Sequence, residues 1–213
     1  MTAVVLFARS PEREAAAKRM AGAAPLFRAV VAAWLREAEA NGARPVIACD
    51  PRDREALAAI APEVRRDWIE QPRAEFGERV CSAVSEAFAR GFGKVVVAAI
   101  DAPPPRRLGE ALAVLANGTP VIGPARDGGV NFIGVTSFDR SLLAKLTHAR
   151  CRALLADAVV FEAATDVDSN ASLAIARREW RGWFPIRPVE RVTRIAHVLA
   201  GATLQLWSRP PPV

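Results

Sequence analysis

The sequence contains no tyrosine and only two histidines, two methionines and three cysteines among its 213 residues. Because His148 and His197 are the only imidazoles, a catalytic triad or metal cluster built on histidine is nearly excluded. Cys49, Cys81 and Cys151 lie far apart and lack the spacing of zinc ligands, so we expect small buried hydrophobic groups rather than disulfides. Any chemistry therefore depends on carboxylates and basic side chains, with or without a bound metal.

Long apolar runs are also missing, and none approaches the roughly 18 residues that a membrane span requires. The N-terminus shows neither a basic leader nor a cleavage site, so we expect a cytoplasmic protein without a membrane span. The net charge of +6 comes mostly from arginine, but no basic tract carries interleaved aromatic residues. Nucleic acid is therefore the poorer candidate partner, and the positive charge fits either an anionic small substrate or only a base composition that favours Ala and Arg codons.

Apolar, strand-like runs alternate with helical segments along most of the chain. Strands are expected at residues 3–8, 44–49, 64–69, 94–100, 119–122, 131–135 and 158–161. Helices are expected at residues 25–40, 50–60, 76–90, 108–115, 138–146, 150–155 and 169–180. This alternation makes right-handed βαβ units, and it predicts an α/β fold in which a mainly parallel sheet is the middle layer of a three-layer α/β/α sandwich.

The length allows one domain of ordinary size with a short appendage. We expect residues 1–180 to form the domain and residues 181–213 to form a C-terminal helical appendage with a proline-rich tail. Apolar residues at helical spacing in the appendage predict a helix that either covers the core or forms a homodimer contact.

Residues 123–135, GPARDGGVNFIGV, carry four glycines between two expected strands. The tripeptide Asp127-Gly128-Gly129 predicts a tight reversal, because glycine reaches positive φ without a steric cost. In an α/β protein that uses a nucleotide, such a hairpin is well placed to form one wall of a substrate pocket. Alone, the tripeptide is as often a plain turn.

Three aspartates follow expected strands: Asp101 comes directly after residues 94–100, and Asp166 and Asp168 come after the last strand. In sheets of this kind ligands bind outside the carboxyl ends of the strands. Mg²⁺ and Mn²⁺ are usually held by one or two carboxylates plus phosphate oxygens, so this pattern suits a metal–nucleotide complex. The alternative is that Asp101 and Asp168 only cap the helices that follow them.

Basic residues crowd the stretch after the first strand, which we expect to be a loop: Arg9, Arg13, Lys18 and Arg19. Guanidinium groups bind phosphates through paired hydrogen bonds, so this loop is a candidate clamp for a triphosphate or a diphosphate leaving group. The alternative is a solvated basic turn.

Four segments together resemble a known superfamily: VVLFARSP, EQPRAEFGERVCSAVSEAFARGFGKVVVAAIDAPPP, GPARDGGVNFIGV and ATDVDSNASL. In order and interval they are similar to the GT-A-fold nucleotide-diphospho-sugar transferases, over roughly residues 3–180. Most closely they resemble the bacterial glycosyltransferase-like family named radical-SAM/selenodomain-associated transferases. The resemblance implies a Rossmann-like fold with a mixed sheet and a transferase that uses Mg²⁺ or Mn²⁺. Its substrates would be a nucleotide sugar or nucleoside triphosphate and a small-molecule acceptor.

The resemblance also implies roles for individual residues. Asp101 would be a catalytic metal ligand and Asp168 the second ligand. Asp127 is a candidate base toward an acceptor hydroxyl. Nucleotide or phosphate contacts would come from the residues of the first loop and the hairpin, namely Arg9, Lys18, Arg19, Gly128, Gly129 and Asn131.

The first loop departs from the family pattern, which has a glycine three residues after the proline and then Lys-Thr-Arg-Leu. Here Glu14 stands at the glycine, and the tetrad is Ala17-Lys18-Arg19-Met20, so the lysine is displaced by one residue while the arginine keeps its place. A flexible lysine stem still reaches a phosphate from Lys18, whereas Glu14 would repel one.

Two other functions stay open. The run Gly128-Gly129-Val130-Asn131 also resembles the Gly-Gly-Thr-Asn of phospholactate guanylyltransferases, which would make the chain a nucleotidyltransferase that consumes GTP. The segment QPRAEFGERV favours the first family. The third alternative is a non-catalytic nucleotide-binding protein that keeps the fold and has lost the chemistry of the first loop.

Overall fold

The computed structural model describes residues 1–20 and 22–180. Residues 1–179 form one compact unit. The expected C-terminal helix and its homodimer contact lie outside the described residues. No helix within the described part of the chain has the length and apolar composition of a membrane span.

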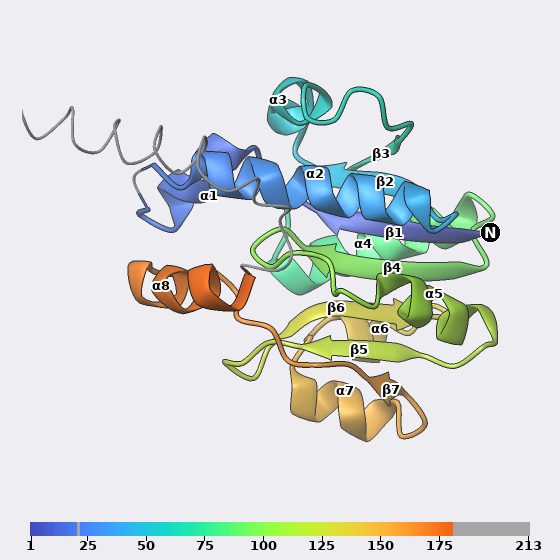
Figure 1. Ribbon diagram of the computed structural model, residues 1–213. Helices are drawn as coiled ribbons and strands as arrows, with labels where there is room; N and C mark the ends of the chain where they lie inside the picture. The colour runs from blue at the N-terminus through green and yellow to red at the C-terminus, as the bar shows by residue number, and fades with distance from the viewer. Residues whose placement is uncertain (21, 181–213) are drawn as a thin grey trace, which may run out of the picture. The chain divides into compact units, whose positions relative to one another are not determined.

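A seven-stranded sheet forms the centre of the unit, in the order β3-β2-β1-β4-β6-β5-β7 (Figure 1). Its strands are β1 (Thr2–Phe7), β2 (Arg44–Cys49), β3 (Asp67–Glu70), β4 (Lys94–Ala99), β5 (Val121–Pro124), β6 (Val130–Val135) and β7 (Val159–Val160). Only β6 runs antiparallel to its neighbours β4 and β5, while the other pairs are parallel. The expected mainly parallel, mixed sheet is therefore confirmed.

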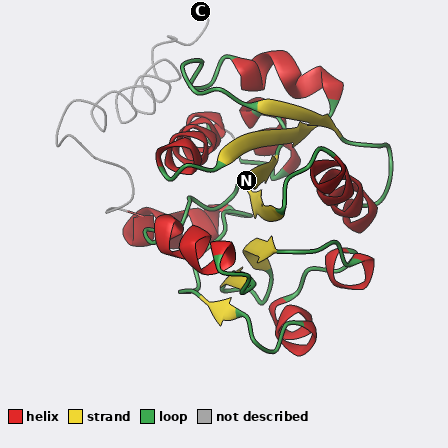
Figure 2. Ribbon diagram, turned by 90° about the vertical axis from the view of Figure 1, so that its right-hand side faces the viewer, coloured by secondary structure: helices red, strands yellow, loops and turns green. Residues whose placement is uncertain are grey.

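Helices cover both faces of the sheet (Figure 2). They are α1 (Pro11–Ala17), α2 (Ala24–Ala40), α3 (Arg54–Ala58), α4 (Phe76–Ala89), α5 (Leu108–Ala116), α6 (Arg140–Leu143), α7 (His148–Leu154) and α8 (Asn170–Glu179), with a 3₁₀ turn, η1 (Pro51–Asp53), before α3. The three-layer sandwich predicted from the alternation of strands and helices is confirmed.

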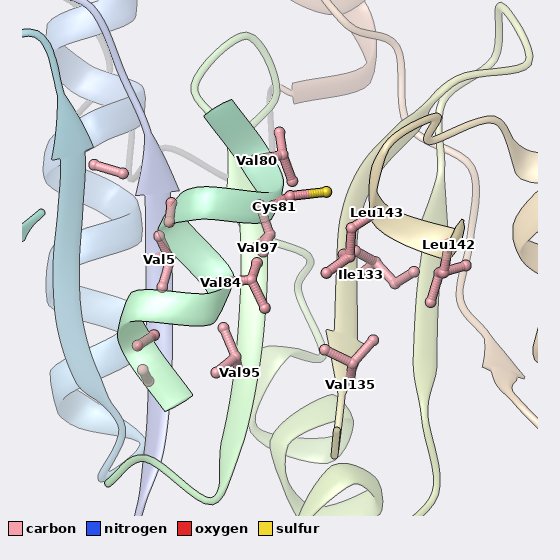
Figure 3. Packing of buried hydrophobic residues seen from close by; sticks show 14 of the residues in the cluster. Val5, Val80, Cys81, Val84, Val95, Val97, Ile133, Val135, Leu142 and Leu143 are labelled. Atoms are coloured by element: carbon pink, nitrogen blue, oxygen red, sulfur yellow. The ribbon is translucent and has the colours of Figure 1, made fainter. Parts of the chain in front are cut away.

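The core on one face of the sheet lies under α4. Val80 and Val84 of α4 are buried and pack against Val97 of β4 and Ile133 of β6 (Figure 3). On the other face Trp34 of α2 is fully buried, and its ring meets Phe132, the neighbour of Ile133 in β6, edge-on with 6.3 Å between ring centroids. Successive residues of a strand point to opposite faces, so β6 contributes to both cores.

The stretch after β1 is not the loop that we expected, because residues 11–17 form helix α1. Pro11 occupies the start of the helix, where its missing N–H costs nothing, and acidic residues follow in the first turn. The sequence PEREAAA has good helix formers but no apolar stripe, so periodicity alone does not show it. Several other bounds shift by a few residues; for example, β3 begins at Asp67, α6 is only Arg140–Leu143, and β7 is only Val159–Val160.

The hairpin between β5 and β6 forms as expected. Ile122 pairs with Ile133, and Gly128 in the connecting turn has a φ of +96°. The Asp127 side chain closes the turn, since its Oδ1 accepts a hydrogen bond of 2.8 Å from the backbone N–H of Gly129.

The three cysteines are buried and free, as predicted. Burial raises the pKa of the Cys49 thiol to about 12 and also raises the pKa of Cys81 and Cys151. Thiolate is the reactive form, so we expect no thiol of the native protein to react with Ellman's reagent within minutes, and all three to react in guanidinium chloride. Rapid labelling of one native thiol would contradict the packing described here.

Candidate active site

Asp101, Asp166 and Asp168 meet at the carboxyl end of β4. One carboxylate oxygen from each lies within 4.8 Å of the others. The two segments are held together by their backbones, because the N–H of Val167 donates a hydrogen bond of 2.9 Å to the carbonyl oxygen of Asp101. The structure thus brings together the two aspartates predicted as metal ligands and adds Asp166.

The helix-capping alternative is wrong for both predicted ligands. Helix α5 begins at Leu108, well beyond Asp101, and its first residue is preceded by Arg107 rather than by an aspartate. Helix α8 is capped by Ser169, whose Oγ accepts a hydrogen bond of 3.2 Å from the N–H of Ser172. The carboxylates of Asp101 and Asp168 are therefore free of helix-capping bonds.

Lys18, at the C-terminal end of α1, inserts its ammonium group into this cluster. Its Nζ donates hydrogen bonds to Asp101 Oδ2 at 2.9 Å, Asp168 Oδ1 at 2.5 Å and the carbonyl oxygen of Val167 at 2.8 Å. Burial works against the charge of Lys18, but Asp101 and Asp168 outweigh it and raise the pKa of the amine. The lysine therefore stays charged throughout the ordinary pH range.

The remaining carboxylate, Asp166, has no lysine partner in the described part of the chain. Burial, the charge of Asp127 and a hydrogen bond with Asp168 raise the pKa of Asp166 to about 7. Crowding of carboxylates at one place favours protonation of one of them. A divalent cation would favour the ionised form of all three. The donor set fits Mg²⁺ or Mn²⁺, which prefer hard oxygen ligands.

The other basic residues of the first segment have different partners. Arg9 lies 3.5 Å from Glu14 and is exposed, so its guanidinium is available to a ligand. Arg13 is bound to the fully buried Asp53 at 2.6 Å, which gives it a structural partner. Arg19 follows α1 with a φ of 53° and pairs with no acidic side chain among the described residues. Of the predicted phosphate ligands, only Lys18 reaches the carboxylates.

A cavity of about 150 Å³ opens beside the cluster, at the carboxyl ends of β1 and β4. Its wall includes side chains that sequence analysis predicted, Arg9, Asp101 and Asn131, and two that it missed, Gln71 and Arg79. The signal was present, because both missed residues belong to the segment QPRAEFGERV that carries the family resemblance. That segment was used only to favour the glycosyltransferase-like family over the guanylyltransferases, and its individual residues were not assigned to the site.

Arg79 is the cation at the far wall of the cavity. Its Nη1 donates a hydrogen bond of 3.1 Å to Gln71, and its guanidinium stacks 5.5 Å from the ring of Phe7 and 5.7 Å from that of Phe76. Burial, followed by the charge of Arg9, lowers the pKa of Arg79. Arg9 and Arg79 offer guanidinium groups to an anionic part of a ligand, while Glu14 and Asp101 in the same wall balance their charge.

The hairpin residues are placed less directly. Asn131 lines the cavity, but its Nδ2 already donates to the carbonyl oxygens of Ala164 at 3.0 Å and Pro124 at 3.3 Å. Gly128 and Gly129 lie in the exposed turn. Asp127 caps that turn, although its charge contributes to the raised pKa of Asp166. The roles of these four residues in nucleotide or acceptor binding stay predictions.

The sheet and its covering helices are similar to the fold of the nucleotide-diphospho-sugar transferases. A structure from Desulfovibrio desulfuricans G20, assigned to those transferases, matches with a TM-score of 0.72 and 22% identity over 96% of this chain and 97% of that one. A 4-diphosphocytidyl-2C-methyl-D-erythritol synthase from Anaerococcus prevotii matches with a TM-score of 0.54 and 10% identity over 85% and 98%.

The family follows from the sequence itself. Residues 34–150 match the family described as "Uncharacterized protein conserved in bacteria (DUF2064)", and the chain belongs to this family. No curated protein sequence matches the chain. The matched region includes Asp101 and the hairpin but not α1, Asp166 or Asp168, so two of the three clustered carboxylates and the lysine lie outside it.

Proposed function

We propose that the chain is a metal-dependent transferase that takes a nucleotide sugar or a nucleoside triphosphate and moves the sugar or nucleotidyl group to a small-molecule acceptor. The observation that carries the proposal is the meeting of Asp101, Asp166 and Asp168, within 4.8 Å of one another, beside a cavity that Asp101 lines together with Arg9 and Arg79. Carboxylates next to cations are what a metal–phosphate complex needs.

In this proposal Asp101 and Asp168 hold the divalent ion, with Asp166 beside them. The bound ion would supply positive charge to the phosphate oxygens of the substrate. Arg9 and Arg79 would bind the anionic parts of the nucleotide from the cavity side, and Lys18 would neutralise the departing phosphate group. Catalysis of this kind is positioning and electrostatic stabilisation, without covalent work by the protein.

Asp127 is proposed as the base toward the acceptor hydroxyl. Its side chain closes the hairpin turn, and its charge acts on Asp166, so it lies near the cluster. The turn leaves Oδ2 without a hydrogen bond among the described residues. That oxygen is the one that would accept a proton.

A thermal-shift titration of the full chain with nucleotide sugars and nucleoside triphosphates, each with and without Mn²⁺, tests the proposal. A ligand at 100 times its dissociation constant stabilises a protein by about 2.7 kcal/mol, which for a chain of this size raises the melting temperature by roughly 5–10 °C. We expect such a rise for one class of nucleotide, and only with Mn²⁺.

The same titration, followed by a turnover assay with the nucleotide that binds, separates the alternatives. A shift with GTP alone would favour the guanylyltransferase that Gly128-Gly129-Val130-Asn131 resembles. Metal-dependent binding without turnover of any acceptor or nucleotide would favour the non-catalytic binding protein. No shift with any nucleotide, in either condition, would overturn the proposed function.

A further inference from the structure

The ammonium of Lys18 uses the same oxygens that a divalent metal would use. An ammonium has three N–H donors, and here they go to Asp101, Asp168 and the carbonyl oxygen of Val167, all within 2.9 Å. The side chain of Lys18 is only 12% exposed, so this is an enclosed contact and not a surface ion pair. The ammonium group of Lys18 therefore occupies the position at which the proposed metal would bind.

The choice of lysine is notable in this sequence. Only three of the 29 basic residues are lysines: Lys18, Lys94 and Lys145. An ammonium is a compact point charge on a flexible stem, whereas a guanidinium is a planar fork. The ammonium of a lysine fits among three converging oxygens, and it can leave them by rotation about the side-chain bonds.

A third carboxylate, besides those of Asp101 and Asp168, offers Lys18 another position. Glu14 precedes it by one helical turn on α1, and its Oε1 lies 3.4 Å from Nζ. Glu14 is buried and lines the cavity, on the side of Arg9. The two departures of the first segment from the family pattern, Glu14 and the displaced Lys18, are thus partners, and helix α1 sets the spacing that joins them.

We propose that Lys18 is a tethered cation that competes with the divalent metal for Asp101 and Asp168, and that it turns toward Glu14 and the phosphates of the nucleotide when the metal binds. The inference rests on the proposed function, because it needs a metal at the carboxylates. A metal ion and an ammonium cannot share the same oxygens, since their charges repel at that distance.

Cooperativity between metal and nucleotide follows from this exchange. In the absence of nucleotide the metal must displace Lys18 from its strongest partners, so the metal alone binds weakly. Phosphate oxygens give the displaced ammonium new partners, so each ligand strengthens the binding of the other. Lys18 would therefore keep the metal from binding until the nucleotide is present.

Mn²⁺ binding to the full chain, followed by the electron paramagnetic resonance signal of the free ion, tests the competition. We expect Lys18→Met to bind Mn²⁺ on the order of tenfold more tightly than the wild type without nucleotide. We also expect nucleotide to improve the Mn²⁺ affinity of the variant less than that of the wild type. The matched control is Lys145→Met, which removes an exposed lysine and should leave both values unchanged.

Three results would count against the inference. Equal or weaker Mn²⁺ binding by Lys18→Met, beside measurable binding by the wild type, would overturn the competition and leave the metal site standing. Failure of wild type and variant alike to bind Mn²⁺ would overturn both the competition and the metal site. Nucleotide binding without metal would then decide whether the chain is still a nucleotide-dependent protein. A Lys18→Met variant that binds more tightly but keeps full cooperativity would overturn the movement toward phosphate.

Lysine labelling of the wild-type protein tests the same inference without relying on a variant that could fail to fold. Acetic anhydride labels accessible lysines, and mass spectrometry distinguishes the three. Without metal, Lys18 should be labelled far more slowly than Lys145, since its amine is hydrogen-bonded and enclosed. Saturating Mn²⁺ should accelerate the labelling of Lys18 alone, and an unchanged rate would contradict its displacement.

Discussion

Replacement of Asp101 by asparagine is expected to reduce metal-dependent nucleotide binding at least about 100-fold, a loss of about 2.7 kcal/mol. The amide keeps the shape of the side chain but removes the charge at the centre of the cluster, where Asp101 faces both Lys18 and Asp168. A divalent ion then loses its most enclosed ligand, since the Asp101 side chain is 22% exposed and that of Asp168 is 56% exposed. Calorimetric titration with nucleotide and Mn²⁺ measures the loss.

The matched control is Asp157→Asn, which neutralises an exposed aspartate in the turn before β7. It should bind metal and nucleotide as the wild type does. If Asp101→Asn retains the wild-type affinity in the presence of Mn²⁺, Asp101 is not a ligand. If it loses binding equally with and without Mn²⁺, the aspartate contacts the nucleotide directly.

The sheet was predictable because each strand carries its own signal. Residues 95–100 are apolar throughout, as a strand covered on both faces must be, and β4 lies at the centre of the sheet. The hairpin was predictable because Gly128 needs positive φ. Helix α1 was not, because its sequence has no apolar period; in the structure Pro11 lies in its first turn and Ala15 packs inward.

A site residue was predictable only where it directly follows a strand, because its position in the sequence then places it at the edge of the sheet where ligands bind. Asp101 follows β4, and the rule that ligands bind at carboxyl ends of strands was enough to select it. The contact of Lys18 with Asp168 joins residues 150 positions apart through two loops, and no local pattern encodes it. Gln71 and Arg79 likewise meet only because α4 starts beside β1, so their shared hydrogen bond is a property of the packing.

Gly77→Ala is expected to destabilise the protein by about 2 kcal/mol or more, because the packing around Gly77 leaves no room for a Cβ atom. In an exposed helix interior, alanine in place of glycine would stabilise by about 0.5–1 kcal/mol. Here the new Cβ would lie 2.0 Å from the backbone oxygen of Ala144 and 2.7 Å from its carbonyl carbon. Backbone cannot rotate away as a side chain does, so α4 and the end of α6 must separate.

Urea unfolding of Gly77→Ala and of a control, Gly93→Ala, measures this cost. A Cβ at Gly93 meets no atom within 4 Å, so the control should stay within about 0.5 kcal/mol of the wild type. Because α4 also carries Arg79 at the cavity wall, the displacement of α4 should weaken nucleotide binding as well. Equal stability of the two variants would mean that α4 does not approach Ala144 as closely as described, and the position of Arg79 beside Gln71 would then lose its support.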